Sequence, residues 1–138
     1  MRLRPLGDLE RAAIQGWRYP PPYDTYDHDE PTAGDYRAAY LDEELVGYVC
    51  FGEPARVDGM GEVSGLVDVG WGLRPDLMGR GLGPRLIEAA LEVHPRARHR
   101  IAVYDWNVRA QRAPAKCGFV PTSERVRDFV LMERAADV

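Results

Sequence analysis

The chain has 138 residues, of which 22 are acidic and 18 basic, and 45% of its residues are hydrophobic. This length predicts one domain with a single core that needs neither a metal nor disulfides for stability. The composition excludes a disordered chain, and no apolar run approaches the roughly 18–20 residues of a membrane-spanning helix. The net charge of −4 argues against a general nucleic-acid-binding protein, which needs a basic surface to contact phosphates.

The cysteines and histidines predict neither a metal site nor a redox site. Cys50 and Cys117 form no C-x-x-C pair, and the three histidines are not spaced as ligand pairs. The amino terminus lacks the apolar stretch of a signal peptide, and no C-terminal lipidation motif is present. We therefore expect a cytoplasmic protein that binds no metal and no membrane.

The predicted elements begin with a strand, a helix and a long loop. Residues 1–6 predict an edge strand that ends at Pro5, and the apolar spacing from Leu9 to Trp17 predicts a helix with Asp8 as its N-cap. Residues 18–34 form a loop rich in proline, tyrosine and aspartate, where the prolines exclude a regular helix or a central strand.

The rest of the chain continues this mixture of strands and helices within one predicted domain, residues 1–138. The remaining predicted elements are strands at 35–41, 45–52 and 63–73, a helix at 84–93, a strand at 101–104, a helix at 107–118, and strands at 119–120 and 129–132. This order is a mixed α/β (α+β) layout.

Three alternating glycines separate the strand at 63–73 from the next helix. The segment reads Met78-Gly-Arg-Gly-Leu-Gly83, and Pro84 suits the first helical turn. It matches neither a P-loop nor the dinucleotide-binding motif. Small residues let backbone amides approach a ligand closely, and a helix N-terminus adds partial positive charge. The segment therefore predicts a site for phosphate oxygens, with a plain strand-to-helix turn as the alternative.

This segment resembles the core motif of the GNAT superfamily of acyl-CoA-dependent N-acetyltransferases. The family motif Q/R-x-x-G-x-G/A aligns with residues 78–83 and is departed from at Met78. A second family motif places an asparagine after the next strand, an alanine three residues later, and Gly-Phe at the end of the helix. It is reproduced by Asn107, Ala110, Lys116, Gly118 and Phe119.

The resemblance implies a single-domain GNAT-like fold, in which helices flank a central, mostly antiparallel and splayed sheet of about 6–7 strands. Acetyl-CoA would bind between the splayed strands as co-substrate, and its acetyl group would pass directly to a primary amine in a ternary complex. The acceptor would be a small molecule or a peptide or protein amine. The alternative is a non-catalytic acyl-CoA-binding or regulatory module with the same fold.

By resemblance, two segments and one asparagine would hold acetyl-CoA. Main-chain amides of residues 79–83 would bind the pyrophosphate, and the backbone at the end of the 63–73 strand would pair with the pantetheine arm. Asn107 would lie beside this arm, although asparagine also favours a helix N-cap. The predicted acetyl-CoA-binding residues are Trp71, Gly72, Leu73, Met78, Gly79, Arg80, Gly81, Leu82, Gly83 and Asn107.

The motifs do not assign the proton-transfer groups. Many family members have a tyrosine in the last helix that protonates the departing thiolate, but Pro114 occupies the aligned position here. Tyr104 at a strand end, or water, could replace this tyrosine. Glu62 and Asp68 are candidate bases, and Asp68 shares a face of its strand with two glycines. A solvent-facing aspartate is the alternative interpretation of Asp68.

The loop at 18–34, with the tryptophan just before it, carries the predicted acceptor site. Its aromatic residues alternate with carboxylates, which suits a cationic amine through cation–π contacts and charge attraction. The alternative is that the rings pack the loop onto the core. The predicted acceptor-binding residues are Trp17, Tyr19, Tyr23 and Tyr26, and the accompanying acids are Asp24, Asp27, Asp29 and Glu30.

Two other classes of partner are considered. Members of the family often dimerise, so the resemblance allows for a homodimer, but no segment indicates an interface. A nucleic-acid partner would need one surface formed by Arg96, Arg98, Arg100, Arg109 and Arg112, and its binding would depend on salt.

Overall fold

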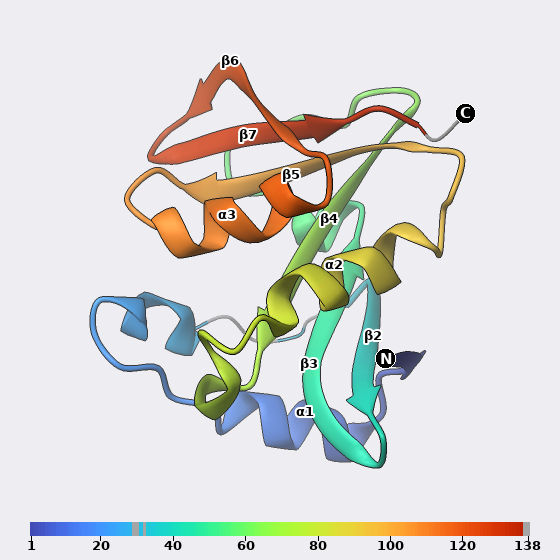
Figure 1. Ribbon diagram of the computed structural model, residues 1–138, viewed down its shortest axis with the longest axis vertical. Coiled ribbons are helices and arrows are strands. Elements are labelled where there is room, and N and C mark those ends of the chain that lie inside the picture. The colour runs from blue at the N-terminus through green and yellow to red at the C-terminus, as the bar shows by residue number, and fades with distance from the viewer. Residues whose placement is uncertain (29–30, 32, 137–138) are drawn as a thin grey trace.

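The computed structural model describes residues 1–28, 31 and 33–136, in which a seven-stranded sheet is flanked by helices (Figure 1). The strands are β1 (Arg2–Pro5), β2 (Asp35–Leu41), β3 (Glu44–Phe51), β4 (Leu66–Leu73), β5 (Arg98–Tyr104), β6 (Val120–Val126) and β7 (Phe129–Arg134). The α-helices are α1 (Asp8–Gln15), α2 (Leu82–Leu91) and α3 (Val108–Lys116). Short 3-10 helices are η1 (Tyr23–His28), η2 (Glu53–Ala55) and η3 (Pro75–Leu77).

The sheet has the order β1-β2-β3-β4-β5-β7-β6. Within the described residues, β4 and β5 are parallel neighbours and all other neighbours are antiparallel. The β4–β5 pairing extends only from Leu66 and Arg98 to Asp68 and Arg100, and beyond it the two strands diverge (Figure 1). The predicted fold, a mostly antiparallel and splayed sheet, is therefore confirmed.

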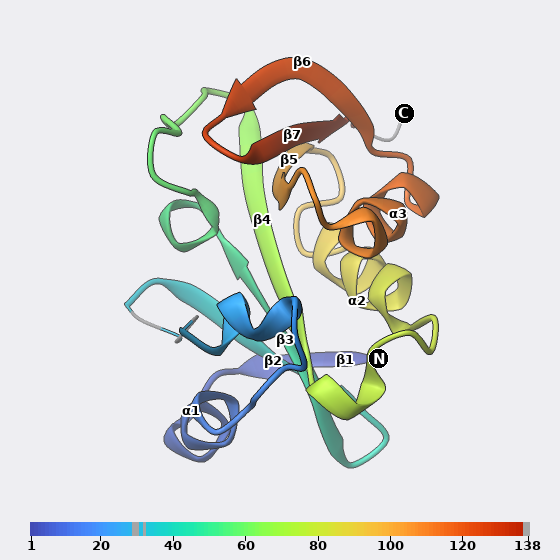
Figure 2. The same cartoon turned by 90° about the vertical axis from the view of Figure 1, so that its left-hand side faces the viewer.

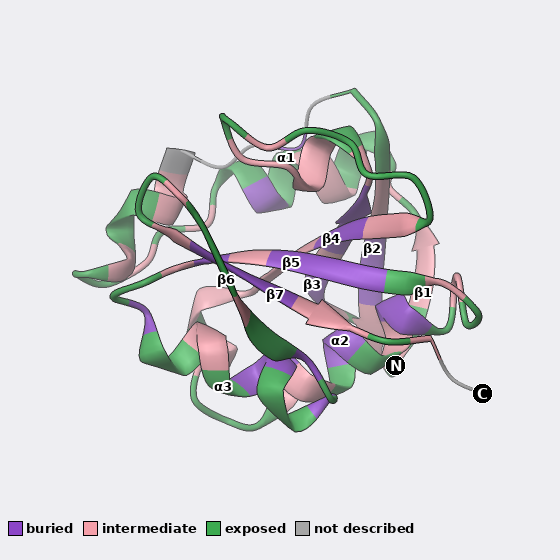
Figure 3. Cartoon of the chain, turned by 90° about the horizontal axis from the view of Figure 1, so that it is seen from above, coloured by how far each residue is buried: buried purple, intermediate pink, exposed green. Residues whose placement is uncertain are grey.

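The core lies between the sheet and α2. Leu86, Ile87 and Ala90 of α2 are fully buried with Val69 of β4 and Ile101 of β5 in one apolar cluster. Helices α2 and α3 lie on one side of the sheet, whereas α1, η1 and η2 lie on the other (Figure 2). Figure 3 shows β5 largely buried and the edge strand β6 mostly exposed. The two sides of the sheet therefore carry different elements.

Several element boundaries differ from those predicted. Strand β4 begins at Leu66 instead of Val63, because Gly65 adopts a φ of 80° and breaks the extended backbone before it. Strand β5 begins three residues earlier than predicted, since β4 pairs with it from Arg98 and β7 from His99 onwards. Strand β6 continues through Pro121, which an edge strand tolerates because it has a side without hydrogen bonds.

Two helical details also differ. The N-cap of α1 is Gly7 instead of Asp8, and the Gly7 N–H donates to Glu10 Oε1 at 2.9 Å. The loop at 18–34 is not irregular throughout, because η1 follows directly after its prolines. The Asp27 carboxylate accepts the Tyr19 N–H at 2.7 Å and ties this short helix to the segment that precedes it.

A buried ion-pair cluster lies where β4 and β5 separate. Asp68 and Arg100 are the last parallel partners, and their side chains are 1% and 4% exposed. Arg100 donates to Asp68 at 2.6 and 3.1 Å and to the Gly61 carbonyl at 2.8 Å. Arg56, which follows η2, donates to Asp68 Oδ2 at 3.0 Å. The hydrogen bond to Asp68 raises the pKa of Arg100, so this guanidinium stays charged although it is buried.

We expect Asp68→Asn to lower the free energy of unfolding by about 3–5 kcal/mol, because it leaves the buried Arg100 without its carboxylate. The matched control is Glu133→Gln, which breaks the more exposed ion pair to Arg98 at 3.1 Å and should cost about 1 kcal/mol or less. Urea denaturation followed by circular dichroism measures both. Equal losses for the two variants would contradict the role given to Asp68.

Candidate functional site

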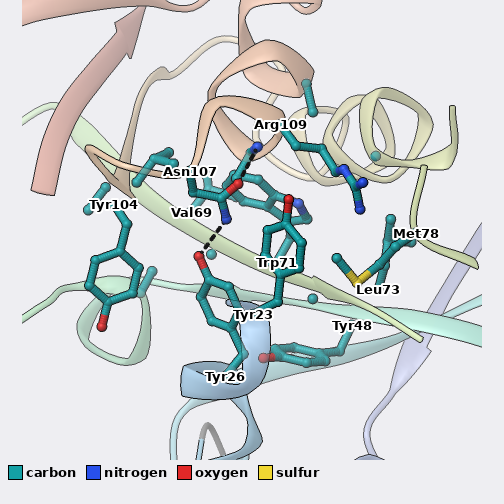
Figure 4. A pocket seen from close by; sticks show the side chains of 18 of the residues that line it. Tyr23, Tyr26, Tyr48, Val69, Trp71, Leu73, Met78, Tyr104, Asn107 and Arg109 are labelled. Atoms are coloured by element: carbon teal, nitrogen blue, oxygen red, sulfur yellow. Dashed lines mark hydrogen bonds between the residues drawn. The ribbon is translucent and has the colours of Figure 1, made fainter. Parts of the chain in front are cut away.

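A cavity of about 720 Å³ lies in the gap between the splayed strands. Residues 69–73 of β4 and 102–104 of β5 line it, and these segments lie beyond the last β4–β5 pair. One half of the cavity is bounded by residues 78–84 and α3, and we call it the α3 half. The other half, the aromatic half, is bounded by Trp17, η1, β2, β3 and η2. Figure 4 shows side chains from both halves pointing into this space.

The glycine turn at residues 79–83 borders the α3 half. Its glycines are required for two different reasons, backbone conformation and close packing. Gly79 and Gly81 have φ angles of 76° and 77°, which glycine adopts without strain. Gly83 is buried against α3, and a Cβ there would lie 3.1 Å from that of Ala113. No other described residue accepts a hydrogen bond from the N–H groups of residues 79–83. The turn therefore presents amides and a helix N-terminus at the cavity.

Three cationic side chains of α3 line the same half of the cavity. They are Arg109, Arg112 and Lys116. The Arg109 guanidinium lies 5.1 Å from the centre of the Tyr23 ring and would be 3.9 Å from a Cβ on Gly79, so it reaches toward the turn (Figure 4). Arg80, which was predicted to bind acetyl-CoA, is exposed and does not line the cavity. Amides and cations together suit a ligand with phosphate groups.

Asn107 links the two halves of the cavity. Its side chain is 5% exposed, and its Oδ1 accepts the Ala110 N–H at 3.0 Å as the N-cap of α3. Its Nδ2 donates to the Tyr26 hydroxyl at 2.8 Å (Figure 4). The predicted N-cap is therefore present, and the same side chain lines the cavity and fastens η1 to α3.

All four aromatic residues predicted for the acceptor site line the cavity: Trp17, Tyr19, Tyr23 and Tyr26. They also pack the loop onto the sheet. The Tyr26 ring lies 5.8 Å from that of Tyr104, and the Tyr19 hydroxyl donates to the Leu73 carbonyl. The two interpretations given to this cluster are thus compatible, since the rings both hold the loop and form a cavity wall.

Sequence reasoning missed Tyr36, Tyr48 and Arg56, which also line the aromatic half. Tyr48 is the cross-strand partner of Gly72, and a Cβ on Gly72 would collide with the Tyr48 ring. The glycine therefore makes room for this ring to lie across β4. The sequence alone shows a tyrosine in one predicted strand and a glycine in the next. That the two lie opposite each other follows only from the register of the strands.

The acids of the 18–34 loop do not line the cavity where they are described. Asp27 is bonded to the Tyr19 amide and Asp24 is exposed, whereas Asp29 and Glu30 lie outside the described residues. No aspartate or glutamate is present among the described residues that line the cavity. The described cavity wall therefore has no carboxylate that could attract a cationic acceptor as predicted.

Of the three candidate catalytic residues, Tyr104 lines the cavity and Glu62 and Asp68 do not. Glu62 is exposed in the segment before β4. Both oxygens of Asp68 accept hydrogen bonds from guanidinium groups, so a substrate proton would compete with those bonds. The alternative interpretation of Asp68 as a solvent-facing residue is wrong, because it is buried. The catalytic roles themselves stay predictions.

Pro114, at the position aligned with the family's tyrosine, faces the core. It is less than 2% exposed and is not among the residues that line the cavity. Its carbonyl accepts the N–H groups of Cys117 and Phe119 at 2.9 and 3.1 Å, which closes the end of α3. A side chain at this position therefore packs inside the protein.

The described residues include neither a candidate metal-binding group nor a candidate membrane-spanning helix. The described residues contain no group of three or more histidine, cysteine, aspartate or glutamate side chains that could hold a metal ion. Among the helices of the described segments, none is long and apolar enough to cross a membrane.

Comparison with known proteins gives a family and a shared fold. Residues 5–119 match the model of the acetyltransferase (GNAT) family. Aminoglycoside acetyltransferase AAC(6′)-Ib, solved with ribostamycin and coenzyme A, is 21% identical with a TM-score of 0.75, over 96% of this chain and 92% of that one. No curated protein sequence matches the chain.

Two other solved structures are similar over nearly their whole length. PseH, an N-acetyltransferase from Campylobacter jejuni solved with acetyl coenzyme A, is 17% identical with a TM-score of 0.71 and 99% coverage of both chains. A variant of the spermidine N-acetyltransferase SpeG from Vibrio cholerae is 18% identical with a TM-score of 0.70, over 98% of this chain and 95% of that one. At these identities the likeness shows the fold.

We expect Pro114→Tyr to lower the free energy of unfolding by about 1–3 kcal/mol, because the phenol overpacks a filled site, and to give no increase in turnover. Ala115→Tyr is the matched control, since the next residue of α3 is exposed and should change stability by about 0.5 kcal/mol or less. Thermal and urea denaturation measure the effect. A stable Pro114→Tyr protein with faster turnover would show that position 114 reaches the site.

Proposed function

Because the chain belongs to the acetyltransferase (GNAT) family, we propose that it transfers the acetyl group of acetyl-CoA directly to a primary amine in a ternary complex. The observation that carries this proposal is the cavity between β4 and β5, whose two halves differ in chemistry. Free amides and cations border the α3 half, and aromatic rings border the other. Two substrates could approach from opposite sides of the sheet and meet where the strands separate.

The residues of the α3 half fit acetyl-CoA. The N–H groups of residues 79–83 would hold its pyrophosphate, and Arg109, Arg112 and Lys116 would add positive charge. Arg80 is exposed, so its contribution would be screened by solvent and salt. These features support the predicted role of the turn.

The pantetheine arm would lie against the open end of β4. Trp71 offers its backbone groups on the β5 side, beyond the last β4–β5 pair, and Asn107 borders the same space. The backbone groups of Gly72 face Tyr48 of β3 instead. The Leu73 carbonyl already accepts the Tyr19 hydroxyl, so sheet-like pairing with this arm would be limited to Trp71 and would end before that carbonyl. Tyr19 would thus mark the boundary between the arm and the acceptor.

Acetyl-CoA supplies an acyl group activated as a thioester. The chain's own residues would orient the two substrates and exclude bulk water, and the acceptor amine must lose a proton before it attacks. Because no described lining residue is a carboxylate, a chain of water molecules is favoured as the route for that proton. The Tyr104 hydroxyl is the candidate donor for the departing sulfur. A cytoplasmic location stays a prediction from the sequence.

The test of the proposal is thiol release from acetyl-CoA against a panel of amines, amino acids, polyamines and short peptides, beside calorimetric titration with acetyl-CoA. We expect binding of acetyl-CoA and thiol release that depends on an amine. Binding without release from any acceptor would favour the non-catalytic acyl-CoA-binding alternative. Absence of binding would contradict both functions.

Gly81→Ala should weaken acetyl-CoA binding by about tenfold or more, because an alanine is strained at a φ of 77° and the turn must shift its amides. Gly65→Ala is the matched control. Gly65 has a similar φ of 80°, and a Cβ at either glycine would meet open space, so both substitutions should strain the backbone equally. Only Gly81 lines the cavity. Similar losses of thermal stability with unequal dissociation constants are expected. Equal affinities would argue against the role of the turn.

A further inference from the structure

The aromatic half of the cavity contains a single charged side chain among its described residues, and that side chain is positive. It is Arg56, whereas the other lining cations belong to α3. The sequence had suggested the opposite, with carboxylates arranged around a cationic acceptor. The charge on this wall therefore favours an acceptor that brings a negative group of its own.

Arg56 is held where a ligand could reach it. It directly follows η2, which packs closely on β4: a Cβ on Gly70 would lie 3.6 Å from the Ala55 Cα. The Arg56 side chain is 19% exposed and donates from Nη1 to Asp68 at 3.0 Å. No other described residue accepts a hydrogen bond from it. A guanidinium has several further N–H donors, so Arg56 has donors left for a ligand.

The charges around Asp68 do not balance within the cluster. Two guanidinium groups, Arg56 and Arg100, share one carboxylate, and Arg100 makes the shorter and more numerous contacts with it. The nearby Glu124 and Glu133 act on Arg100, and Asp68 is the described ion-pair partner of Arg56. The three side chains alone, Asp68, Arg56 and Arg100, therefore carry one net positive charge, and Arg56 is the one of them that lines the cavity. A partly buried charge of this kind is stabilised by a partner of opposite sign.

We propose that Arg56 binds a carboxylate of the acceptor, so that the acceptor is an amine that also carries a carboxylate, as an amino acid does. This inference rests on the proposed acetyl transfer. The planar guanidinium group matches a carboxylate through parallel hydrogen bonds. A carboxylate also carries the single negative charge that balances the cluster, whereas a phosphate monoester carries more.

The surrounding rings are consistent with this orientation. Trp17 and Tyr48 stack with ring centres 6.4 Å apart, and Tyr36 lies 6.1 Å from Tyr48. These rings would contact the apolar part of the acceptor and leave its amine to point toward the opening between β4 and β5. Arg56 would then hold the end of the acceptor away from the acetyl group.

The experiment compares common L-amino acids with their α-carboxamides, which keep the amine and side chain and lack the carboxylate. Thiol release is measured at saturating acetyl-CoA. We expect kcat/KM of the wild type to be about tenfold or more higher for the best acids than for their amides. Basicity alone favours the amides, because their amines are more often unprotonated at neutral pH.

Arg56→Met should abolish this preference and lower kcat/KM for the acids by about tenfold or more, with an unchanged dissociation constant for acetyl-CoA. The variant keeps the Asp68–Arg100 pair, so the protein should stay folded, which thermal unfolding checks. Arg56→Lys keeps the charge without the planar group and should retain part of the preference. Arg125→Met removes an exposed arginine of β6 as the control and should behave like the wild type.

Failure of this inference is distinct from failure of the proposed function. If the wild type acetylates the amides or polyamines as well as the acids, acetyl transfer stands and carboxylate binding is contradicted. If no amine releases thiol, acetyl transfer fails, and saturation-transfer NMR with the same acids and amides tests Arg56 directly in the presence of coenzyme A. Selective binding of the acids that Arg56→Met removes supports the inference, and absent or unselective binding overturns it.

Discussion

The site depends on how early the pairing between β4 and β5 ends. Only the residues from Leu66 to Asp68 pair with β5, and the backbone that follows becomes the wall of a cavity instead of a ladder. The Asp68–Arg100 ion pair lies at that end and holds the two strands together where their hydrogen bonds stop. A longer ladder would close this space. The protein therefore forms its cavity by separating two strands and leaves the core beneath α2 filled.

Alternation along β4 gives the two sides of the sheet their different chemistry. Val69 faces the buried cluster that includes α2, whereas Gly70 and Gly72 face Cys50 and the Tyr48 ring. Because the glycines lack side chains, rings and η2 can approach the strand closely on that side. The same strand thus supports a packed core on one face and an open, aromatic surface on the other.

Local patterns predicted the fold, the glycine turn, the cap at Asn107 and the four aromatic residues, since each depends on residues close in sequence or on motif spacing. The partners of Asp68 could not be predicted in this way. Arg100 meets it through the parallel register, and Arg56 reaches it from η2, so neither contact follows from periodicity. Asp27 of the 18–34 loop could not be placed from the sequence for a similar reason. Its carboxylate was expected near the acceptor, but it accepts a hydrogen bond from the Tyr19 amide instead.

The buried ion-pair cluster where β4 and β5 separate has a structural task, and under the proposal above it also takes part in binding the acceptor. A buried ion pair stabilises a fold weakly, because desolvation offsets much of the attraction between its charges. Here Asp68 and Arg100 define where the strands part, and the second arginine carries the charge that this pair does not neutralise. Arg56 is less buried than Arg100 and borders the cavity, so the excess charge lies on the side where a substrate can balance it. If Arg56 binds the acceptor as proposed, the Asp68 carboxylate serves both purposes: it pairs with Arg100 where the strands part, and it holds Arg56 at the cavity wall. This double use gives a reason for an aspartate among glycines on a central strand.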